Sequence, residues 1–165
     1  MIEEMRTIRT HLLATAACLL LCVGARAETL DVCPTGCTYA SIQNAIDASS
    51  DGDTIAVAAG TYHEFDITLQ GKAITISGDT DSNGLPAVTI DSQGMGTNII
   101  GFFGEGNDTI IEHLVFTGCS GEGVAAVTMF HADPIMINCT FIDNVNTGLG
   151  GGAYNLNGSP HFIDC

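Results

Sequence analysis

Short runs of alternating hydrophobic and polar residues dominate the chain from residue 54 onward. "TIAVAAG" places Ile55 and Val57 on one side of an extended segment, and "AITISG" does the same with Ile74 and Ile76. Such alternation is typical of β-strands, because successive side chains point to opposite faces of a sheet. The other runs of this kind are "AVTID", "NIIGFF", "TIIEHLVF", "AAVTMF", "PIMINCTF" and "AYNL". The pattern predicts many short strands separated by turns rich in Gly, Asn, Asp and Ser.

One segment before these strands has the spacing of a helix instead. In "TYASIQNAIDASSDGD" the less polar residues recur every three or four positions from Tyr39 to Ser49. This spacing predicts a helix over 39–49, with Thr38 as its N-cap and Gly52 as its stop signal. Residues 28–53 are therefore expected to form an N-terminal loop and a single helix.

A repeat of about 26 residues decides how the strands are arranged. Residues 127–130 fall 26 positions before residues 153–156, and Phe116 falls 25 before Phe141. Three further pairs are each 26 apart: Pro134 and Pro160, Ile137 and Ile163, and Cys139 and Cys165. A period in the twenties, built from short strands and turns, predicts a parallel β-solenoid over residues 54–165.

The solenoid makes specific predictions about its faces and its ends. In "PIMINCTF" strict alternation directs one set inward, namely Ile135, Ile137, Cys139 and Phe141. It directs the other set outward, namely Met136, Asn138, Thr140 and Ile142. An open end of a solenoid exposes unpaired strand groups, so we expect the helix to cap the N-terminal end. No such cap follows Cys165, and we expect the chain to be a fragment with further coils after it.

The sequence also resembles a known group of β-helix proteins. "YASIQNAIDASSDGDTIAVAAGTYHE" resembles the opening segment of right-handed parallel β-helix proteins of the pectin-lyase-like superfamily. "FIDN" and "GGAY" resemble the FxxN and GGA-aliphatic motifs of polymorphic outer-membrane protein repeats. The motif residues are Phe141, Asn144, Gly151, Gly152, Ala153 and Tyr154. One coil earlier, "FTGC" places Cys119 where the FxxN motif has asparagine. The resemblance implies an all-β, right-handed β-helix on or outside the cell, as in adhesins, autotransporter passengers and polysaccharide-degrading enzymes.

The first 27 residues have the pattern of a secretory signal peptide. Arg6 and Arg9 precede the apolar run 12–23, and Ala25 and Ala27 form a small-residue cleavage site. The run of about 12 residues is too short to span a bilayer, although an amino-terminal anchor remains the alternative. Cleavage leaves residues 28–165, without a transmembrane span, at a secreted, cell-surface or outer-membrane location.

Acidic residues far outnumber basic ones, and this restricts the partners. The whole chain has 19 Asp and Glu, 4 Lys and Arg, and a net charge of −15. After residue 27 there are 17 acidic residues and one strong base, Lys72, which gives −16. This charge excludes nucleic acid as a partner, because nucleic acid is bound chiefly through lysine and arginine. It also disfavours anionic polysaccharides and acidic lipids unless a divalent cation intervenes. Solubility in a salty medium is the simpler explanation of the charge.

One loop has the spacing of a calcium ligand set. Asp79, Asp81 and Asn83 alternate before Gly84, as at the start of a calcium-binding loop. The twelfth position is not a glutamate but Ile90, followed by Asp91, so these four oxygen-bearing residues are candidate ligands for calcium and a plain polar loop is the alternative. Five cysteines follow residue 27, of which Cys33 and Cys37 can close a small disulfide loop.

The sequence after residue 27 offers little for catalysis. By the resemblance, lyases of the superfamily use an arginine or lysine base, and its pectin methylesterases pair two aspartates with an arginine. The chain has no arginine there, and the environment of Lys72 predicts a solvated charge. Four carboxylates are candidates for a hydrolase: Glu112, Asp133, Asp143 and Asp164. Aspartates are common in turns for backbone reasons alone, and four histidines, His63, His113, His131 and His161, share no column of the repeat. No catalytic residue is predicted.

We therefore expect a secreted or cell-surface β-helix that binds or adheres, with glycans or cell-surface molecules as partners. The alternative is an extracellular polysaccharide-active enzyme, a pectate-lyase-like lyase or a hydrolase, with catalytic coils beyond residue 165. A third hypothesis is a purely structural spacer. Calcium is the single cofactor for which the sequence offers candidate ligands.

Overall fold

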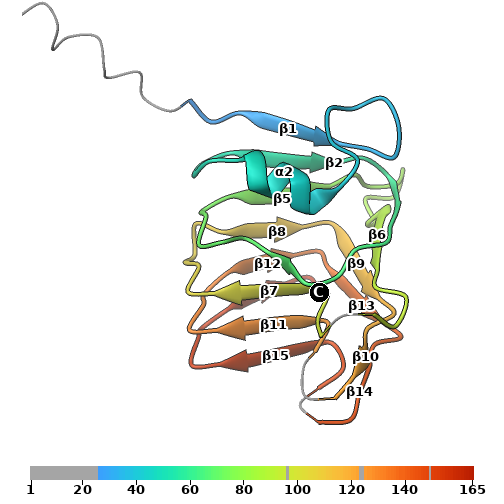
Figure 1. Cartoon of the computed structure of the whole chain (residues 1–165), viewed down its shortest axis with the longest axis vertical. Coiled ribbons are helices and arrows are strands. Elements are labelled where there is room, and N and C mark those ends of the chain that lie inside the picture. The colour runs from blue at the N-terminus through green and yellow to red at the C-terminus, as the bar shows by residue number, and fades with distance from the viewer. Residues whose placement is uncertain (1–25, 96, 123–124, 149) are drawn as a thin grey trace, which may run out of the picture.

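The chain forms a right-handed parallel β-helix of about five turns, as the computed structural model in Figure 1 shows. The structure describes residues 26–95, 97–122, 125–148 and 150–165. The predicted signal peptide, apart from residues 26 and 27, lies outside the described residues. The predicted all-β solenoid fold is confirmed.

Three parallel sheets make up the walls of the β-helix. Sheet A contains β1 (Thr29–Val32), β2 (Thr54–Val57), β5 (Thr75–Gly78), β8 (Ile110–Glu112), β12 (Ile135–Ile137) and β16 (His161–Ile163). Sheet B contains β3 (Gly60–Tyr62), β6 (Val88–Asp91), β9 (Leu114–Thr117) and β13 (Thr140–Ile142). Sheet C contains β4 (Ile67–Thr68), β7 (Ile100–Phe103), β11 (Val127–Phe130) and β15 (Ala153–Leu156). A small additional sheet pairs β10 (Ser120–Gly121) with β14 (Val145–Asn146).

The strand register follows the sequence repeat. Ile137 pairs with Ile163 in sheet A, and Phe116 pairs with Phe141 in sheet B. In sheet C residues 127–130 pair one by one with residues 153–156. These are the 25- and 26-residue spacings of the sequence, so each period of the repeat is one coil.

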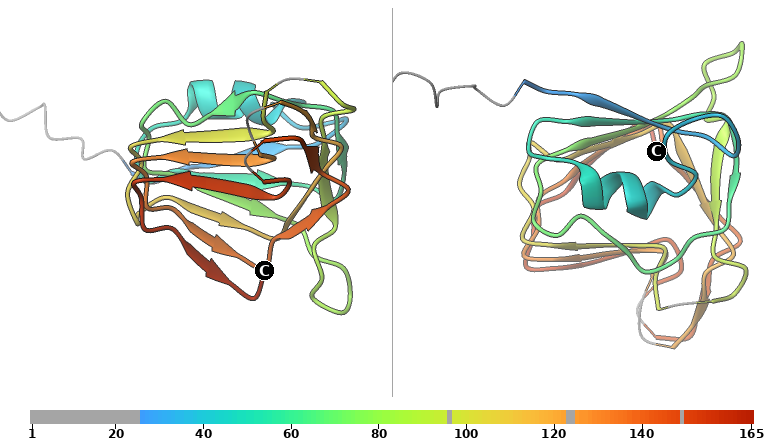
Figure 2. Two further views of the ribbon diagram at one scale, coloured as in Figure 1. Left: turned by 90° about the horizontal axis from the view of Figure 1, so that it is seen from below. Right: turned by 45° about the horizontal axis from the view of Figure 1, so that its top comes forward.

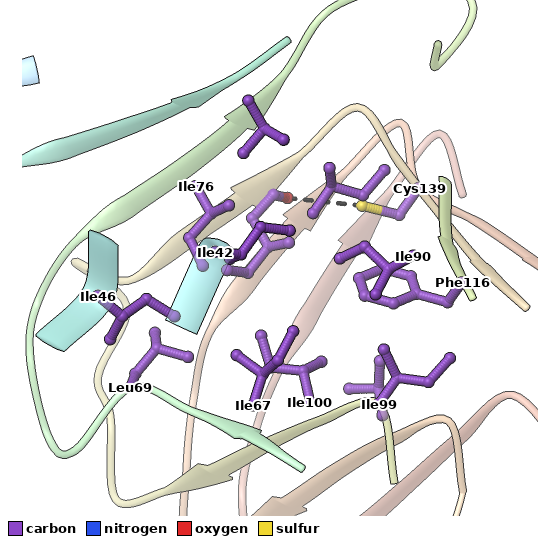
Figure 3. Close-up of a cluster of buried hydrophobic side chains, with 14 of the residues drawn as sticks. Ile42, Ile46, Ile67, Leu69, Ile76, Ile90, Ile99, Ile100, Phe116 and Cys139 are labelled. Atoms are coloured by element: carbon purple, nitrogen blue, oxygen red, sulfur yellow. Dashed lines mark hydrogen bonds between the residues drawn. The ribbon is translucent and has the colours of Figure 1, made fainter. Parts of the chain in front are cut away.

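Aliphatic and aromatic side chains from all three sheets fill the interior of the β-helix (Figure 3). No coil buries its inner face alone, because the side chains above and below complete the contacts. One inward column of sheet A consists of Leu30, Ile55, Ile76, Ile111, Met136 and Phe162. Four of these, Ile55, Ile76, Ile111 and Met136, are fully buried.

The predicted orientation of "PIMIN" is wrong. Met136 is fully buried, whereas Ile135 and Ile137 are partly exposed. Cys139 is buried as predicted. The reason is Asn138, whose φ of 48° turns the chain at the corner between β12 and β13. A residue in this left-handed conformation interrupts the two-residue alternation, so the positions before and after the corner follow opposite phases.

The predicted helix is shorter than expected and has a different cap. Helix α2 spans Ile42–Ala48, and its N-cap is Ser41, not Thr38. The Ser41 side chain accepts a hydrogen bond from the Asn44 N–H at 3.3 Å, as N-cap residues do. Tyr39 lies outside the helix because its backbone forms a parallel bridge with Val32. The segment 28–53, expected to be a loop and helix, also contains β1, which pairs with β2.

Helix α2 lies across the N-terminal end of the β-helix, as the right panel of Figure 2 shows. Its residues Ile42, Ala45 and Ile46 are fully buried and belong to the same core as the strands. The helix thus covers the end of the hydrophobic interior, and the predicted capping role agrees with its position.

Candidate functional site

Aromatic rings, exposed at Phe103 and half-buried at Phe130 and Tyr154, lie along the outer face of sheet C. Phe103 and Phe130 pair in register on β7 and β11, and Leu156 continues the column on β15. The ring centroids of Phe103 and Phe130 are 5.7 Å apart with an interplanar angle of 20°. Tyr154 packs edge-on against Phe130 at 6.1 Å. We call Phe103, Phe130, Tyr154 and Leu156 the sheet C ladder.

Alternation along the strands places the ladder outside the core. Phe102 and Met129 are fully buried in the interior, so Phe103 and Phe130, one position later, point outward. Phe103 is 57% exposed and Leu156 is 40% exposed. Phe130, which lies between them in the column, is half-buried. Apolar side chains that gather on a surface can mark a binding site.

Gly101 allows the Phe103 ring to approach the strand closely. A Cβ at position 101 would lie 2.8 Å from Cε2 of Phe103, closer than side-chain carbons pack. The ring therefore extends back over Gly101 and rests on the backbone. This contact fixes the first aromatic ring of the ladder while leaving more than half of its side chain in solvent.

Sequence reasoning did not identify the sheet C ladder. The sequence signal for the ladder lies in "GFF" and "VTMF". In each, an aromatic residue follows an inward-facing residue at the end of the sheet C strand, in two consecutive coils. A single exposed aromatic residue is unremarkable in a sequence. Only the register between β7 and β11 shows that the two rings are stacked.

The candidate calcium ligands serve as turn residues in the structure. The Asp81 carboxylate accepts hydrogen bonds from the backbone N–H groups of Leu85 (2.9 Å) and Asn83 (2.8 Å), which lower its pKa. Asp79 Oδ2 accepts from the Ala59 N–H at 3.0 Å. Asp91 Oδ1 accepts from the Gln93 N–H, and its other oxygen lies 3.7 Å from His63 Nδ1. Within the described ranges no three His, Cys, Asp or Glu side chains form a metal-binding group, and calcium binding stays a prediction.

Lys72 is bound to the C-terminus of helix α2. Its Nζ donates to the backbone carbonyl oxygens of Ile46 at 2.5 Å and of Asp47 at 3.1 Å. A cation at this end of a helix satisfies free carbonyls and interacts favourably with the helix dipole. These contacts give Lys72 a structural role as a helix cap.

The four candidate carboxylates of a hydrolase belong to different parts of the coil. Glu112 accepts a hydrogen bond from Ser77 Oγ (2.7 Å) on the outer face of sheet A. Asp133 accepts from the Ser159 N–H (2.5 Å) in the loop after sheet C. Asp143 and Asp164 are exposed corner residues with φ values of 51° and 53°. Glu112 and Asp133 thus have local hydrogen bonds, and the four carboxylates belong to different strands and corners of the coils.

A cavity of about 370 Å³ opens between helix α2 and β3. Its lining includes Ser41, Thr61, His63 and Glu64. The Glu64 carboxylate accepts hydrogen bonds from the N–H groups of Ile42 (2.7 Å) and Gln43 (3.1 Å) and from Ser41 Oγ (3.1 Å). Glu64 therefore stabilises the start of the helix, where unpaired N–H groups favour a negative charge.

The cysteines have three different environments. Cys33 and Cys37 are joined by a disulfide bond with a Cα–Cα distance of 5.6 Å. Cys119 and Cys139 are buried free thiols, and Cys165 is exposed. Burial raises the pKa of the Cys139 thiol to about 12, so this thiol, drawn in Figure 3, is an inert part of the core.

The residues that resemble the FxxN and GGA-aliphatic motifs lie on β13, on β15 and in the segment between them. Asn144 Nδ2 donates to the Phe116 carbonyl (2.8 Å), and Asn144 Oδ1 accepts from the Cys119 N–H (3.0 Å). Phe141 stacks on Phe116 with centroids 5.4 Å apart. At Gly151 a Cβ would collide with the Asn144 carbonyl oxygen. Asn144 and Phe141 thus hold one coil to the next, and Gly151 allows the chain to pass close to the Asn144 carbonyl.

Comparison with known proteins supports the fold. No protein-family model matches the sequence, and no curated protein matches it. Among solved structures, the chain is similar to the pectin methylesterase from Aspergillus niger in its deglycosylated form, with a TM-score of 0.53 and 18% sequence identity. The match covers 86% of this chain and 57% of that chain. At this identity the likeness shows a shared β-helix fold.

A search of the described ranges for a helix of sufficient length and apolarity to cross a membrane found none.

Proposed function

We propose that this protein is a secreted or cell-surface β-helix that binds neutral glycans through the sheet C ladder. The observation that carries the proposal is the position of Phe103, which rests on Gly101, stacks with Phe130 and is 57% exposed. Aromatic ring faces pack well against the apolar C–H faces of sugar rings. Because Phe130 stacks on Phe103 and meets Tyr154 edge-on, these two residues support the Phe103 ring. The exposed part of Phe103 and the exposed Leu156 are the surface that the ladder offers to an oligosaccharide.

Charge favours a neutral ligand over an acidic one. Residues 28–165 contain 17 acidic side chains. Lys72 is the single lysine in this segment, which has no arginine. Lys72 Nζ is already bonded to the end of helix α2. A polymer of uronic acids is negatively charged and would be repelled by this negatively charged protein. A neutral sugar is not repelled.

The fold is compatible with carbohydrate as a partner. The structurally similar protein is a pectin methylesterase, which acts on a polysaccharide. A shared fold does not carry a shared activity, and Lys72, Glu112 and Asp133 make structural contacts in the described coils. We therefore propose binding without catalysis in this segment.

Calorimetric titration with neutral hexaoses of glucose, xylose and mannose, with oligogalacturonate for comparison, tests the proposal. We expect micromolar to millimolar binding to at least one neutral hexaose and none to oligogalacturonate. In Phe103→Ala and Phe130→Ala, the loss of about 1 kcal/mol per ring weakens binding about fivefold each. Ile142→Ala, which removes a 50% exposed side chain from sheet B, is the matched control and should bind normally.

Binding that survives in the Phe103→Ala/Phe130→Ala double variant would overturn the assignment to the ladder. Absence of binding across the neutral panel would overturn the proposed ligand class. Release of methanol from pectin, or shortening of any polymer by this protein, would instead favour the polysaccharide-active enzyme.

A further inference from the structure

Glu28 is held on both sides of its backbone, immediately before β1. Its N–H donates to Asp53 Oδ1 at 2.8 Å, and its carbonyl oxygen accepts from the Thr54 N–H at 2.8 Å. Strand β1 begins one residue later, at Thr29, and pairs with β2 from that residue onward. The hydrogen bonding of sheet A thus extends back to Glu28, the residue that follows the predicted cleavage site at Ala27.

Asp53 is a buried carboxylate that no cationic side chain neutralises. It is only 7% exposed. Its Oδ2 accepts from the Ser50 N–H at 2.7 Å, and its Oδ1 accepts from Glu28. These two N–H groups, that of Glu28 most, lower the pKa of Asp53, so the carboxylate is ionised at neutral pH. Within the described ranges no lysine, arginine or histidine side chain forms an ion pair with it. A buried charge is costly unless it is paired, so the position beside Oδ1 suits a cation.

Removal of a signal peptide after Ala27 places a cation at this position. Hydrolysis by a signal peptidase adds one water molecule across the Ala27–Glu28 peptide bond. The carboxylate of Ala27 leaves with residues 1–27, and the nitrogen of Glu28 becomes an α-ammonium group. An α-amino group titrates at about pH 8 and is therefore mostly charged at neutral pH. Its hydrogen bond to a carboxylate is about twice as strong as that of a neutral amide.

We propose that cleavage after Ala27 creates an ion pair between the α-ammonium group of Glu28 and the buried carboxylate of Asp53. This pair fixes β1, the edge strand of sheet A, to the turn before β2. The proposal rests on the secretion half of the proposed function and is independent of glycan binding. It goes further, because the processing site then supplies a charged group that stabilises the N-terminal end of the β-helix.

The other charged groups near this end are engaged elsewhere. Lys72 contributes least to the lowered pKa of Asp53, and its Nζ donates to the carbonyls of α2. Asp51, in the same turn, accepts from a backbone N–H before β5, and Asp47 on α2 accepts from side-chain amides. Glu28 is itself exposed, so solvent screens its own side-chain carboxylate. Asp53 is thus the carboxylate that the new terminus meets.

The ion pair predicts a particular pH dependence. A carboxylate at this distance raises the pKa of the Glu28 α-amino group in the folded protein above its unfolded value of about 8. The stabilisation is therefore fully present below about pH 8 and is lost as the pH rises through the folded pKa.

The first experiment uses the full-length gene, expressed in an exporting bacterial host, and the product purified after export. N-terminal sequencing should read Glu-Thr-Leu-Asp. The mature chain then has two primary amines, the α-amine of Glu28 and the side chain of Lys72. Competitive labelling with acetic anhydride between about pH 6 and pH 11, read peptide by peptide by mass spectrometry, gives the pKa of each. We expect the α-amine pKa to be about one unit higher in the folded protein than in urea.

Two variants and a blocked terminus show which carboxylate is responsible. Asp53→Asn should remove the rise of the α-amine pKa, whereas the matched control Asp51→Asn, which alters another carboxylate of the same turn, should keep it. Selective acetylation of the terminus should lower the melting temperature at pH 7 by about 3–5 °C in the unmodified sequence and in Asp51→Asn. In Asp53→Asn acetylation should change it by less than about 1 °C. At about pH 10 the effect should shrink in every protein, because the amine is then losing its charge.

A mature N-terminus at any residue other than Glu28 would overturn the inference. An α-amine pKa that Asp53→Asn leaves unchanged would overturn it as well. If Asp53→Asn does not fold, the free and acetylated termini of the unmodified sequence decide, and equal melting temperatures at pH 7 refute the ion pair. Glycan titration of the same mature protein tests the proposed function separately. Absence of glycan binding overturns that ligand class, while a raised α-amine pKa in the same sample still supports the ion pair.

Discussion

At the scale of single residues, the corners of this β-helix depend on side chains that tolerate a left-handed backbone. His113, Asn138 and Asp164 follow consecutive strands of sheet A in register, and all three have φ between 48° and 59°. Asparagine, aspartate and histidine are several-fold enriched at such positions. Any of these three residue types can therefore occupy the corner. Because the corner position is not marked by one amino acid, it is hard to recognise in the sequence.

Asn144 is the residue for which we predict the clearest effect on stability. Asn144→Ala removes both bonds that join it to the preceding coil, and the Phe116 carbonyl and Cys119 N–H lose their partner. We expect the free energy of unfolding in urea to fall by about 1–3 kcal/mol. The control Asn107→Ala, on an exposed loop, should change it by less than about 0.5 kcal/mol. Equal values for the two variants would contradict the bridging role.

At the scale of elements, helix α2 is held by side chains at both of its ends. A helix of seven residues is unstable on its own. Glu64 from the segment after β3 accepts from its first N–H groups, and Lys72 donates to its last carbonyls. Burial of Ile42 and Ile46 adds a hydrophobic contribution. The cap is thus formed by the first coils as much as by the helix sequence.

Replacing Lys72 tests the contribution of this residue to the stability of the cap. Lys72→Met keeps the aliphatic stem but removes the charge, and we expect a loss of about 1 kcal/mol of unfolding free energy. Lys72→Arg keeps a donor and a charge and should recover at least half of that loss. Chemical denaturation measures both. An unchanged stability in Lys72→Met would show that the contact with α2 contributes nothing.

At the scale of the whole molecule, a large negative charge is spread over a narrow β-helix. Residues 28–165 carry a net charge of −16. Self-repulsion at this density opposes the compact state. Hydrogen bonds to individual aspartates offset part of it: those from the N–H groups of Glu28 and Ser50 lower the pKa of Asp53.

Salt should therefore stabilise the protein. We expect the melting temperature of residues 28–165 to rise by several degrees between about 10 mM and 150 mM NaCl, as the Debye length falls from about 30 Å to about 8 Å. KCl should act equally. CaCl₂ at matched ionic strength distinguishes screening from a site: a further rise that Asp81→Asn removes would support the predicted calcium ligands. A melting temperature that stays constant or falls with NaCl would contradict the repulsion argument.

The strand pairing of the β-helix could largely be predicted, because residues that pair in neighbouring coils recur at a fixed spacing in the sequence. The pairing of Ile137 with Ile163 and of Phe116 with Phe141 follows directly from spacing. Which residues of "PIMIN" point inward could not be predicted. The φ of Asn138 reverses the alternation, and nothing in the sequence fixes that angle. Strand β1 was missed for a related reason: four residues are too short to show a period, and their strand form depends on pairing with β2.

The candidate site depended on tertiary structure almost entirely. The sequence by itself determined the solenoid, the capping helix and an acidic surface that disfavours anionic partners, because hydrophobic period and charge are properties of the linear chain. Only the folded structure placed Phe103 on Phe130 and brought the Asn98 amide to the same glycine as the ring. The first contact joins residues of neighbouring coils, and the second joins residues within one strand and the position just before it. Their geometry depends on the strand register and on the backbone angles at the corners, which no local sequence pattern encodes.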